Sequence, residues 1–501
     1  MPSRLIRGSR ILTLNTVGDA HAEADILIKS GRIAAIGRSL IPPEGAEIID
    51  GRGMLAMPGL INAHVHSPAN FMRGTLEGLP LELFMLYEVP PLTERPPSKR
   101  TAYIRTLLGA MEMLKLGITS VMDDAFYVPM PTPETIDGVM EAYRDIGMRA
   151  TTTLDQPNIV EYAKYPFLAE LLPETIRSRM EAAPVASAGY LLEQYDHLIT
   201  RWHGAAHGRL RAGVSCSAPQ RVTIPYFEAL SALSKARDLP FVVHMLETKL
   251  QRVFGQEKLG KSLVRYVHDL GLLDERMQIV HAIWVDDADM RLIADAGCVV
   301  AHNPVCNLKL GSGIMPFRAL RDHGIPICLG TDEAVADDTH NLWAVAKMAG
   351  LIHKITDSDY LRWPSAAEIL RCLFEGGARA MRQQGAIGNL VVGAEADLVL
   401  LDLETLAFTP LNDVVRQLVY CENGSSVRLT MVAGEIVMRD GVILNVDEKA
   451  IKAEARAIMA ELAGDFAQAH SAARELDAYY RAMYLKAAQT EIGMNRWAHP
   501  T

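Results

Sequence analysis

The stretch LINAHVHSP, residues 60–68, is an apolar run that ends in two histidines, His64 and His66, one residue apart. Residues i and i+2 of a β-strand point to the same face. Two imidazoles that leave a buried strand in one direction are typical of a metal site. The pair alone is weak evidence, because this spacing is also common by chance, so further ligands are needed from elsewhere in the chain.

Seven further apolar segments follow this one, and amphipathic helical patterns such as residues 102–116 and 224–237 separate them. The eight expected strands are LINAHVHS, GITSVMDDA, RATTTLDQ, LRAGVSCSA, PFVVHMLET, MQIVHAIWV, CVVAHNPV and PICLGTDEA. Alternation of strands and helices places the chain in the α/β class. Eight such units predict a (β/α)8 TIM barrel over residues 58–388.

The two flanks of this barrel predict a second module. Residues 1–57 alternate apolar and polar side chains around a Ser30-Gly31 turn, which is a hairpin signal, and residues 389–445 repeat the pattern. We therefore expect one small β-sandwich domain formed from both segments. Residues 446–501 are rich in Ala and Glu and predict a helical C-terminal extension. This extension is either a surface helix on the barrel or an oligomer contact.

Composition narrows the class of protein. Among 501 residues, 60 are acidic and 50 basic, and no basic stripe is present, so we expect no nucleic-acid partner. No apolar run reaches the roughly 18 uncharged residues of a membrane span, so we expect no membrane partner. The first residues, MPSRLIRGSRILTLNT, lack an export signal, and six scattered cysteines indicate reduced thiols. These features predict a cytoplasmic enzyme.

Polar side chains follow the ends of several predicted strands. His64 and His66 end the first strand, His244 lies in the fifth, His281 in the sixth, and Asp332 follows the eighth. The carboxyl ends of barrel strands share one rim, where active sites form. We therefore expect these side chains to converge. Taken singly, each has a simpler explanation, since an Asp after a strand often caps a helix and a lone His is often a core residue.

This set has the ligand chemistry of a borderline divalent ion such as zinc or iron. The predicted ligands are His64, His66, His244 and Asp332. A remaining position would hold water, whose pKa falls from 15.7 to about 7 on a metal. Glu247 lies three residues beyond His244 and is placed to carry the proton of that water to a leaving group. His281 is placed to hydrogen-bond the attacked group.

The chain resembles the amidohydrolase superfamily up to about residue 445. The motifs that carry the resemblance are PGLINAHVHS, HMLET, VHAIWVDD, AHNPVCNLKLGSG, LGTDEAVADD and GAIGNLVVGAEADLVLLD. It looks like the cytosine-deaminase-like branch. That branch includes aminohydrolases for guanine, S-adenosylhomocysteine, methylthioadenosine and triazines, and chlorohydrolases for related triazines.

The resemblance implies one divalent metal ion, zinc in the first place, with iron or manganese as alternatives. It also implies that Asp332 is both ligand and base, that Glu247 shuttles the proton, and that His281 is the branch's strand-6 histidine. The expected fourth strand, LRAGVSCSAP, lacks the lysine with which two-metal branches bridge their ions. A homodimer or homotetramer is implied as well.

Two residues are candidate substrate contacts. Glu94 lies one position from the place where nucleoside-deaminating relatives hold ribose hydroxyls, and a helix-capping role is the alternative. Asn303 follows the seventh strand, where it would either contact substrate or hold the loop. The glutamine that guanine-deaminating relatives carry soon after the two histidines is not matched by residues 67–70 (SPAN).

Together these features predict a metal-dependent hydrolase. Metal-bound hydroxide would remove an exocyclic amino group from a nitrogen heterocycle of the purine, pterin, pyrimidine or triazine type. Hydrolytic dechlorination, or amide- or urea-type C–N hydrolysis on a related substrate, is the alternative. A non-catalytic binding protein is a minor alternative, against which the intact ligand set argues.

Overall fold

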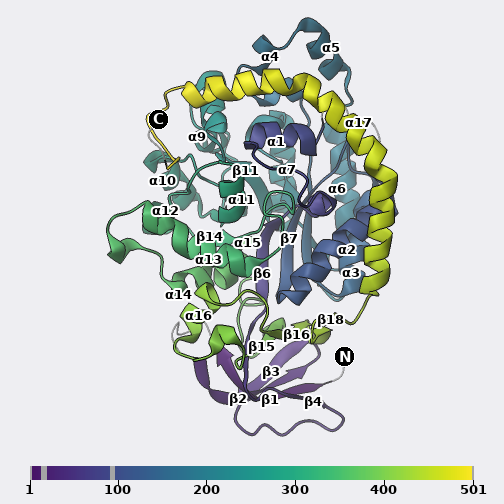
Figure 1. Ribbon diagram of the computed structural model, residues 1–501, viewed down its shortest axis with the longest axis vertical. Coiled ribbons are helices and arrows are strands. Elements are labelled where there is room, and N and C mark those ends of the chain that lie inside the picture. The colour runs from purple at the N-terminus through teal and green to yellow at the C-terminus, as the bar shows by residue number, and fades with distance from the viewer. Residues whose placement is uncertain (1–2, 13–19, 91–95, 499–501) are drawn as a thin grey trace.

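Short parallel strands form the centre of the molecule (Figure 1). The computed structural model describes residues 3–12, 20–90 and 96–498. One sheet has the order β6–β7–β8–β9, and the other has the order β10–β11–β12–β13–β14. Their bounds are β6 Leu60–Val65, β7 Ile118–Phe126, β8 Arg149–Asp155, β9 Leu210–Ala212, β10 Val214–Ser215, β11 Phe241–Met245, β12 Met277–His281, β13 Val299–His302 and β14 Ile327–Leu329.

The two parallel sheets touch at β9–β10 and at β14–β6. Only Gly213 separates β9 from β10, and a Cβ there would lie 2.8 Å from the Thr153 side chain. The amide of Asp332, beyond β14, donates to the carbonyl of His64 in β6 at 2.9 Å. All eight predicted strands are therefore present, and the fourth is divided in two where a side chain would not fit.

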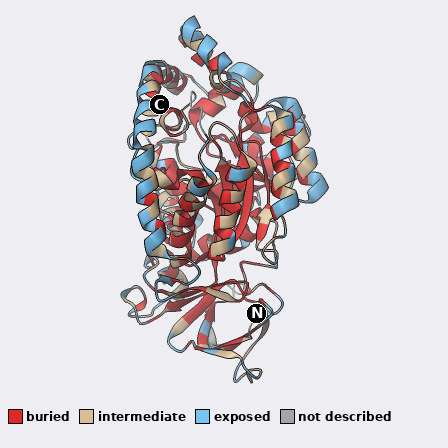
Figure 2. Ribbon diagram, turned by 90° about the vertical axis from the view of Figure 1, so that its right-hand side faces the viewer, coloured by how far each residue is buried: buried red, intermediate tan, exposed pale blue. Residues whose placement is uncertain are grey.

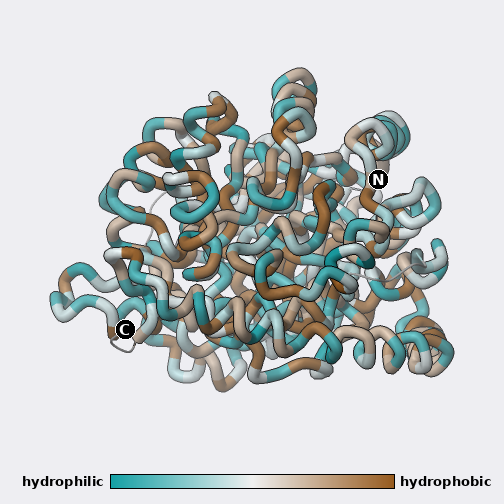
Figure 3. The backbone as a smooth tube through the Cα atoms, turned by 90° about the horizontal axis from the view of Figure 1, so that it is seen from above, coloured by the Kyte–Doolittle hydropathy of each residue, from teal (hydrophilic) through white to brown (hydrophobic). Residues whose placement is uncertain are grey.

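Helices connect the parallel strands and cover them, so that the strands are buried and the outer helical faces are exposed (Figure 2). Seen from above, the outer helices alternate hydrophilic and hydrophobic residues, as amphipathic helices do (Figure 3). Within the described residues, no helix combines the length and apolarity that a membrane span requires. The α-helices in the first part of the chain are α1 Leu81–Glu88, α2 Lys99–Lys115, α3 Pro133–Ile146, α4 Leu168–Leu171, α5 Glu174–Ala182, α6 Ala188–Trp202, α7 Ile224–Arg237, α8 Lys249–Phe254 and α9 Leu263–Asp269. The others are α10 Asp287–Ala296, α11 Pro304–Lys309, α12 Phe317–Asp322, α13 Leu342–Ile352, α14 Ala366–Arg371, α15 Gly377–Ala380, α16 Val414–Tyr420 and α17 Glu448–Gln489.

Segments from both flanks of the chain share one nine-stranded mixed sheet below the parallel strands (Figure 1). Its order is β18–β17–β16–β15–β5–β1–β2–β3, with β4 paired to β1. The bounds are β1 Arg4–Leu12, β2 Ala20–Lys29, β3 Arg32–Gly37, β4 Glu47–Asp50, β5 Met54–Pro58, β15 Leu398–Asp402, β16 Val427–Val432, β17 Glu435–Arg439 and β18 Val442–Ile443. Antiparallel pairing of β5 with β15 joins the two flanks. Strands from both flanks therefore share one sheet, whereas this pairing does not confirm a sandwich.

A buried ion pair connects this sheet to the parallel strands. Arg149 at the start of β8 donates from Nε to Asp397 Oδ2 at 2.6 Å. Asp397 Oδ1 also accepts from the amide of Ala433 at 2.7 Å. Because both charged side chains are almost fully buried, removing one partner would leave an uncompensated charge.

The 42-residue helix α17 runs along the outside of the molecule (yellow in Figure 1). Its second half packs on α1, α4 and α8, where Tyr480 and Met483 share an apolar cluster with Leu83 of α1. Tyr480 Oη also donates to Glu161 Oε1 at 3.3 Å. This half of the predicted extension therefore lies on the strand–helix body, and an oligomer contact through α17 stays a prediction.

Candidate metal centre and active site

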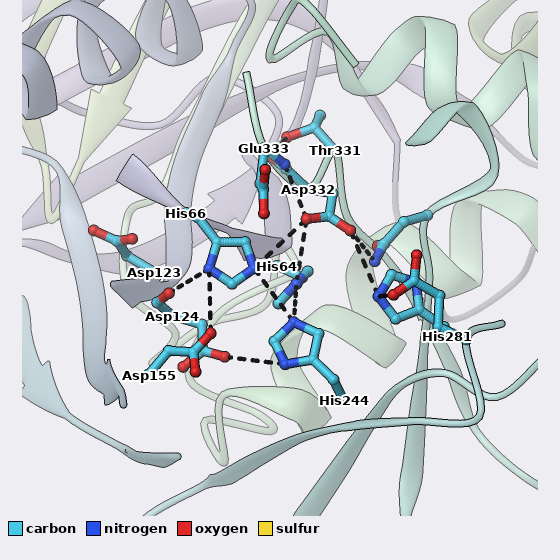
Figure 4. Close-up of polar contacts among 12 residues, drawn as sticks. His64, His66, Asp123, Asp124, Asp155, His244, His281, Thr331, Asp332 and Glu333 are labelled. Carbon is cyan, nitrogen blue, oxygen red and sulfur yellow. Dashed lines mark hydrogen bonds and ion pairs between the residues drawn. The ribbon is translucent and has the colours of Figure 1, made fainter. Parts of the chain in front are cut away.

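Four of the predicted side chains meet at the carboxyl ends of β6, β11 and β14 (Figure 4). His244 Nε2 lies 3.2 Å from His64 Nε2 and 3.3 Å from His66 Nε2. Asp332 Oδ1 lies 3.6 Å from the Nε2 atoms of both His64 and His66. A tetrahedron with zinc–ligand bonds of about 2.0–2.1 Å has edges of about 3.3–3.4 Å. The two distances between histidine nitrogens are close to this edge, and the two to Asp332 Oδ1 are slightly longer.

Backbone carbonyls fix the tautomers of two of these histidines. His66 Nδ1 lies against the carbonyl of Asp124, and His244 Nδ1 lies 2.9 Å from the carbonyl of Ser217. A carbonyl only accepts hydrogen bonds, so each Nδ1 carries the proton and each Nε2 presents its lone pair. Within the described residues, His64 Nδ1 has no hydrogen-bond partner.

Burial also keeps these imidazoles in the form that binds a cation. It lowers the pKa of His66 and His244, and it lowers the pKa of His64 far more, with a further contribution from the neighbouring imidazoles. A neutral imidazole is the metal-binding species. Three neutral nitrogens and one carboxylate oxygen fit a zinc ion, and they also accommodate iron or manganese.

Asp124 comes within 4.8 Å of the same three histidines and is a second carboxylate to consider as a ligand. Its Oδ2 lies 3.7 Å from Nδ1 of His244, which is the nitrogen on the outer side of that ring. Burial raises the pKa of Asp124 well above its usual value, and the nearby Asp155 adds to the shift. Asp332 Oδ1, in contrast, lies 3.6 Å from the Nε2 atoms of His64 and His66, so it faces the unprotonated nitrogen of His66.

Glu247 and His281 lie together beside the other oxygen of Asp332. His281 Nε2 is 3.3 Å from Glu247 Oε2 and 3.7 Å from Asp332 Oδ2. The hydroxyl of Ser312 donates to Glu247 Oε1 at 3.0 Å. Burial raises the pKa of Glu247 well above that of an ordinary glutamate, with added repulsion from Asp332. A carboxyl group with a raised pKa can hold a proton at neutral pH and deliver it to a substrate.

Two asparagines orient this pair of groups. Asn307 Nδ2 donates to His281 Nδ1 at 2.9 Å, so Nε2 of His281 carries its proton toward Glu247 and Asp332. Asn303 Nδ2 donates to Asp332 Oδ2 at 3.2 Å. Asn303 is fully buried and lies outside the set of described residues that line the cavity, so it contacts a predicted ligand rather than open space.

The other candidate substrate contact, Glu94, lies outside the described residues.

The backbone is strained where these side chains leave their strands. Positive φ angles occur at His281 (77°), at Asp332 (65°) and at Leu246 (55°), which precedes Glu247. L-residues adopt this region at a cost, and such positions cluster where function holds a side chain in one direction.

A cavity opens over the ligands and is lined by α1, by residues 155–161 and 183–186, and by η3 (Pro219–Arg221). Among its charged residues that the sequence analysis did not name as candidates are Glu88, Arg221 and Glu333. Burial raises the pKa of Glu88 to about 7. Glu333 could have been predicted, because it follows the predicted ligand Asp332 in the sequence. The positions of Glu88 and Arg221 depend on how α1 and η3 pack, which the sequence does not show.

Comparison with known proteins gives matches along most of the chain. A family model described as "Amidohydrolase family" matches residues 55–437. The 5′-deoxyadenosine deaminase of Methanosarcina mazei is 27% identical over 92% of this chain and 99% of its own length. The 5-methylthioadenosine/S-adenosylhomocysteine deaminase of Nitratidesulfovibrio vulgaris is 30% identical over 90% and 96%.

Solved structures agree in fold. An adenosine deaminase from Xanthomonas campestris with bound zinc superimposes with a TM-score of 0.79 at 24% identity, over 95% of this chain and 99% of that chain. An atrazine chlorohydrolase from Arthrobacter aurescens complexed with zinc gives a TM-score of 0.82 at 25% identity, over 91% and 99%.

Proposed function

Because this chain belongs to the amidohydrolase family, we propose that it is a metal-dependent aminohydrolase that removes an exocyclic amino group from a nitrogen heterocycle. The observation that carries the proposal is the cluster of three Nε2 atoms and Asp332 Oδ1, with Glu247 and His281 beside it. Relatives named as deaminases of adenosine derivatives make 6-aminopurine nucleosides the first substrates to test.

His64, His66, His244 and Asp332 would hold the ion. When bound, the ion supplies Lewis acidity that makes water nucleophilic at neutral pH. Glu247 holds a proton at its carboxyl group and gives it to a ring nitrogen next to the attacked carbon. Its carboxylate then takes up the proton that the attacking water loses and delivers it to the departing amine, which leaves as ammonia. His281, oriented by Asn307, donates from Nε2 and keeps Asp332 and Glu247 at a fixed distance.

Ammonia release tests this proposal. Zinc-, iron- and manganese-loaded protein is assayed on adenosine derivatives, pterins, pyrimidines and aminotriazines, with chelated protein as the metal-free control. Glu247→Gln should retain metal yet lower kcat by about 10²- to 10⁴-fold, because it removes proton transfer in the transition state. The matched control is Glu257→Gln, an exposed glutamate in the segment between α8 and α9. Unchanged turnover in Glu247→Gln would refute the role of Glu247.

Hydrolytic dechlorination is the second candidate, because an atrazine chlorohydrolase shares this fold at a TM-score of 0.82. Chloride leaves without a proton, so that reaction does not need the raised pKa of Glu247. Assaying chloride and ammonia on one aminochlorotriazine separates the two reactions. Amide- or urea-type hydrolysis remains a further alternative on the same substrate panel.

We also propose that residues 58–388 act as a closed (β/α)8 barrel, that residues 1–57 and 389–445 form one β-domain, and that residues 446–501 are a helical extension. The contacts at Gly213 and between Asp332 and His64 support closure. The sandwich form, the homodimer or homotetramer, and the cytoplasmic location stay predictions.

A further inference from the structure

Two carboxyl groups that the proposed chemistry does not use line the same cavity as the metal ligands. Glu88 is the last residue of α1, and Glu333 follows Asp332. Each carboxyl group affects the pKa of the other, because the two lie close together. A Glu333 carboxylate oxygen also lies within 4.8 Å of ligand atoms of His66 and Asp332. The carboxyl pair Glu88–Glu333 therefore sits next to the place where a reacting carbon must bind.

Each member of this pair keeps a free acceptor. Within the described part of the chain, Glu88 Oε1 and Glu333 Oε2 have no hydrogen-bond partner, although Glu88 is only 6% exposed. Arg221 lines the same cavity but contacts Ser217 Oγ at 3.4 Å and Met85 Sδ at 3.1 Å instead of forming an ion pair with a described carboxylate. Because both residues line the cavity, these two oxygens are placed to accept hydrogen bonds from a bound molecule.

The surroundings of Glu88 as a whole disfavour an ionised carboxylate, because burial is the largest effect on its pKa. Glu88 lies at the C-terminus of α1, where the partial negative charge of the helix repels an anion. Burial of the side chain adds a desolvation cost. An acidic side chain that lowers the stability of the fold and faces a cavity is a candidate for ligand binding.

We propose that the pair Glu88–Glu333 recognises N–H donors, and that the substrate is a heterocycle with a second amino group, separated from the attacked carbon by one ring nitrogen. This inference rests on the proposed function and specifies its substrate class as diaminopurines, diaminotriazines or diaminopyrimidines. The second amino group presents N–H donors to the two free oxygens, and a carboxyl oxygen accepts such hydrogen bonds whether or not the group is ionised. A C–H group at the same position leaves both oxygens without a partner.

Binding of matched ligand pairs tests the inference without turnover. The parent protein is zinc-loaded Glu247→Gln, titrated calorimetrically with 2-amino-1,3,5-triazine and 2,4-diamino-1,3,5-triazine, and with 5′-deoxyadenosine and its 2-amino derivative. The parent should bind each diamino ligand at least about tenfold more tightly than its monoamino partner. Adding Glu88→Gln or Glu333→Gln should reduce this preference to less than about threefold, since each replaces one of the two carboxyl acceptors with an amide.

Glu161→Gln is the matched control. Glu161 lines the same cavity, but Tyr480 Oη and Lys164 Nζ already occupy its oxygens, so the diamino preference should survive its replacement. Thermal melting checks that all variants are folded. Equal binding of the two ligands by the parent, or a preference that survives both pair substitutions, would overturn the inference.

Ammonia release by the wild-type protein separates this result from the proposed function. If the wild type deaminates monoamino and diamino ligands equally well, the proposed function is supported and the role of Glu88–Glu333 is refuted. If the wild type releases no ammonia from any ligand yet binds diamino ligands preferentially, the proposed function is refuted and the role of Glu88–Glu333 is supported.

Discussion

The hydrogen bond from Asn307 to His281 sets which nitrogen of that imidazole carries the proton. Asn307→Asp would present an acceptor to Nδ1, move the proton to Nδ1, and leave Nε2 without a donor toward Asp332. We expect kcat to fall about 10- to 100-fold, because His281 loses its hydrogen bond from Asn307. Bound zinc should be unchanged, because none of the proposed metal ligands is altered. Steady-state kinetics and metal analysis on the same preparation check this.

Asn307→Leu is the companion variant, since it removes the amide without adding a charge. It should lower kcat less than Asn307→Asp and leave KM close to the wild-type value. If Asn307→Asp loses zinc in proportion to its loss of kcat, the asparagine supports the ligands rather than the tautomer of His281.

The site residues divide into those that a sequence can locate and those that it cannot. His64 and His66 share a face because strands have a period of two, and Asp332 lies at a strand exit, so their convergence follows from the barrel pattern. Asn307 and Glu88 lie on short helices outside the strands, and no periodicity indicates what such helices face. The contact of Asn307 with His281 and the position of Glu88 in the cavity follow only from the three-dimensional structure.

Helix α17 is the element with the clearest effect on the cavity. Tyr480 is fully buried against α1 and η2 (Glu161–Lys164), and both of these elements contribute cavity-lining residues. Tyr480→Ala should lower the free energy of unfolding by about 3–5 kcal/mol, the usual cost of deleting a buried aromatic ring. It should also raise KM, because α1 and η2 lose their support. Urea unfolding and steady-state kinetics measure the two effects.

Tyr480→Phe is the control that keeps the ring and removes only the hydrogen bond to Glu161. Its expected cost is about 0.5–1.5 kcal/mol. Equal stabilities of Tyr480→Ala and the wild type would show that α17 does not support the cavity wall.

The sequence predicted that residues 446–501 are helical, and α17 covers Glu448–Gln489. It did not predict that α17 lies on α1, because an apolar stripe shows which side of a helix is buried but not what buries it. The same limit applies to the strands of the mixed sheet. Alternation identified the flanks as β-rich, yet the order of nine strands depends on pairing that alternation does not encode.

At the scale of the whole molecule, buried neutral histidines away from the ligand set make stability depend on pH. Burial lowers the pKa of His340 to about 3 and that of His353 to about 3. An unfolded histidine has a pKa near 6.5, so below about pH 6.5 the unfolded state binds protons that the folded state does not. Stability should therefore fall as the pH decreases from about 6.5 toward 3, and these groups should have no effect above that range.

His353→Gln tests this at one position, since Gln can still bond to Nε2 of His302, which lies 3.0 Å from Nε2 of His353. Each histidine contributes up to about 1.4 kcal/mol per pH unit. The unfolding free energy measured between pH 7.5 and 4.5 should fall less steeply in the variant. Parallel curves for the two proteins would contradict the assignment.

The pairing of β5 with β15 has a consequence for how the protein is made. Leu398 lies opposite Pro58, so about 340 residues must be added before β5 meets this neighbour. A ribosome working at roughly 5–20 residues per second needs about 20–70 s for that length. During this interval the apolar strand Met54–Pro58 presents an open edge on which another nascent chain can add. Chaperone capture of the growing polypeptide would matter most in this window.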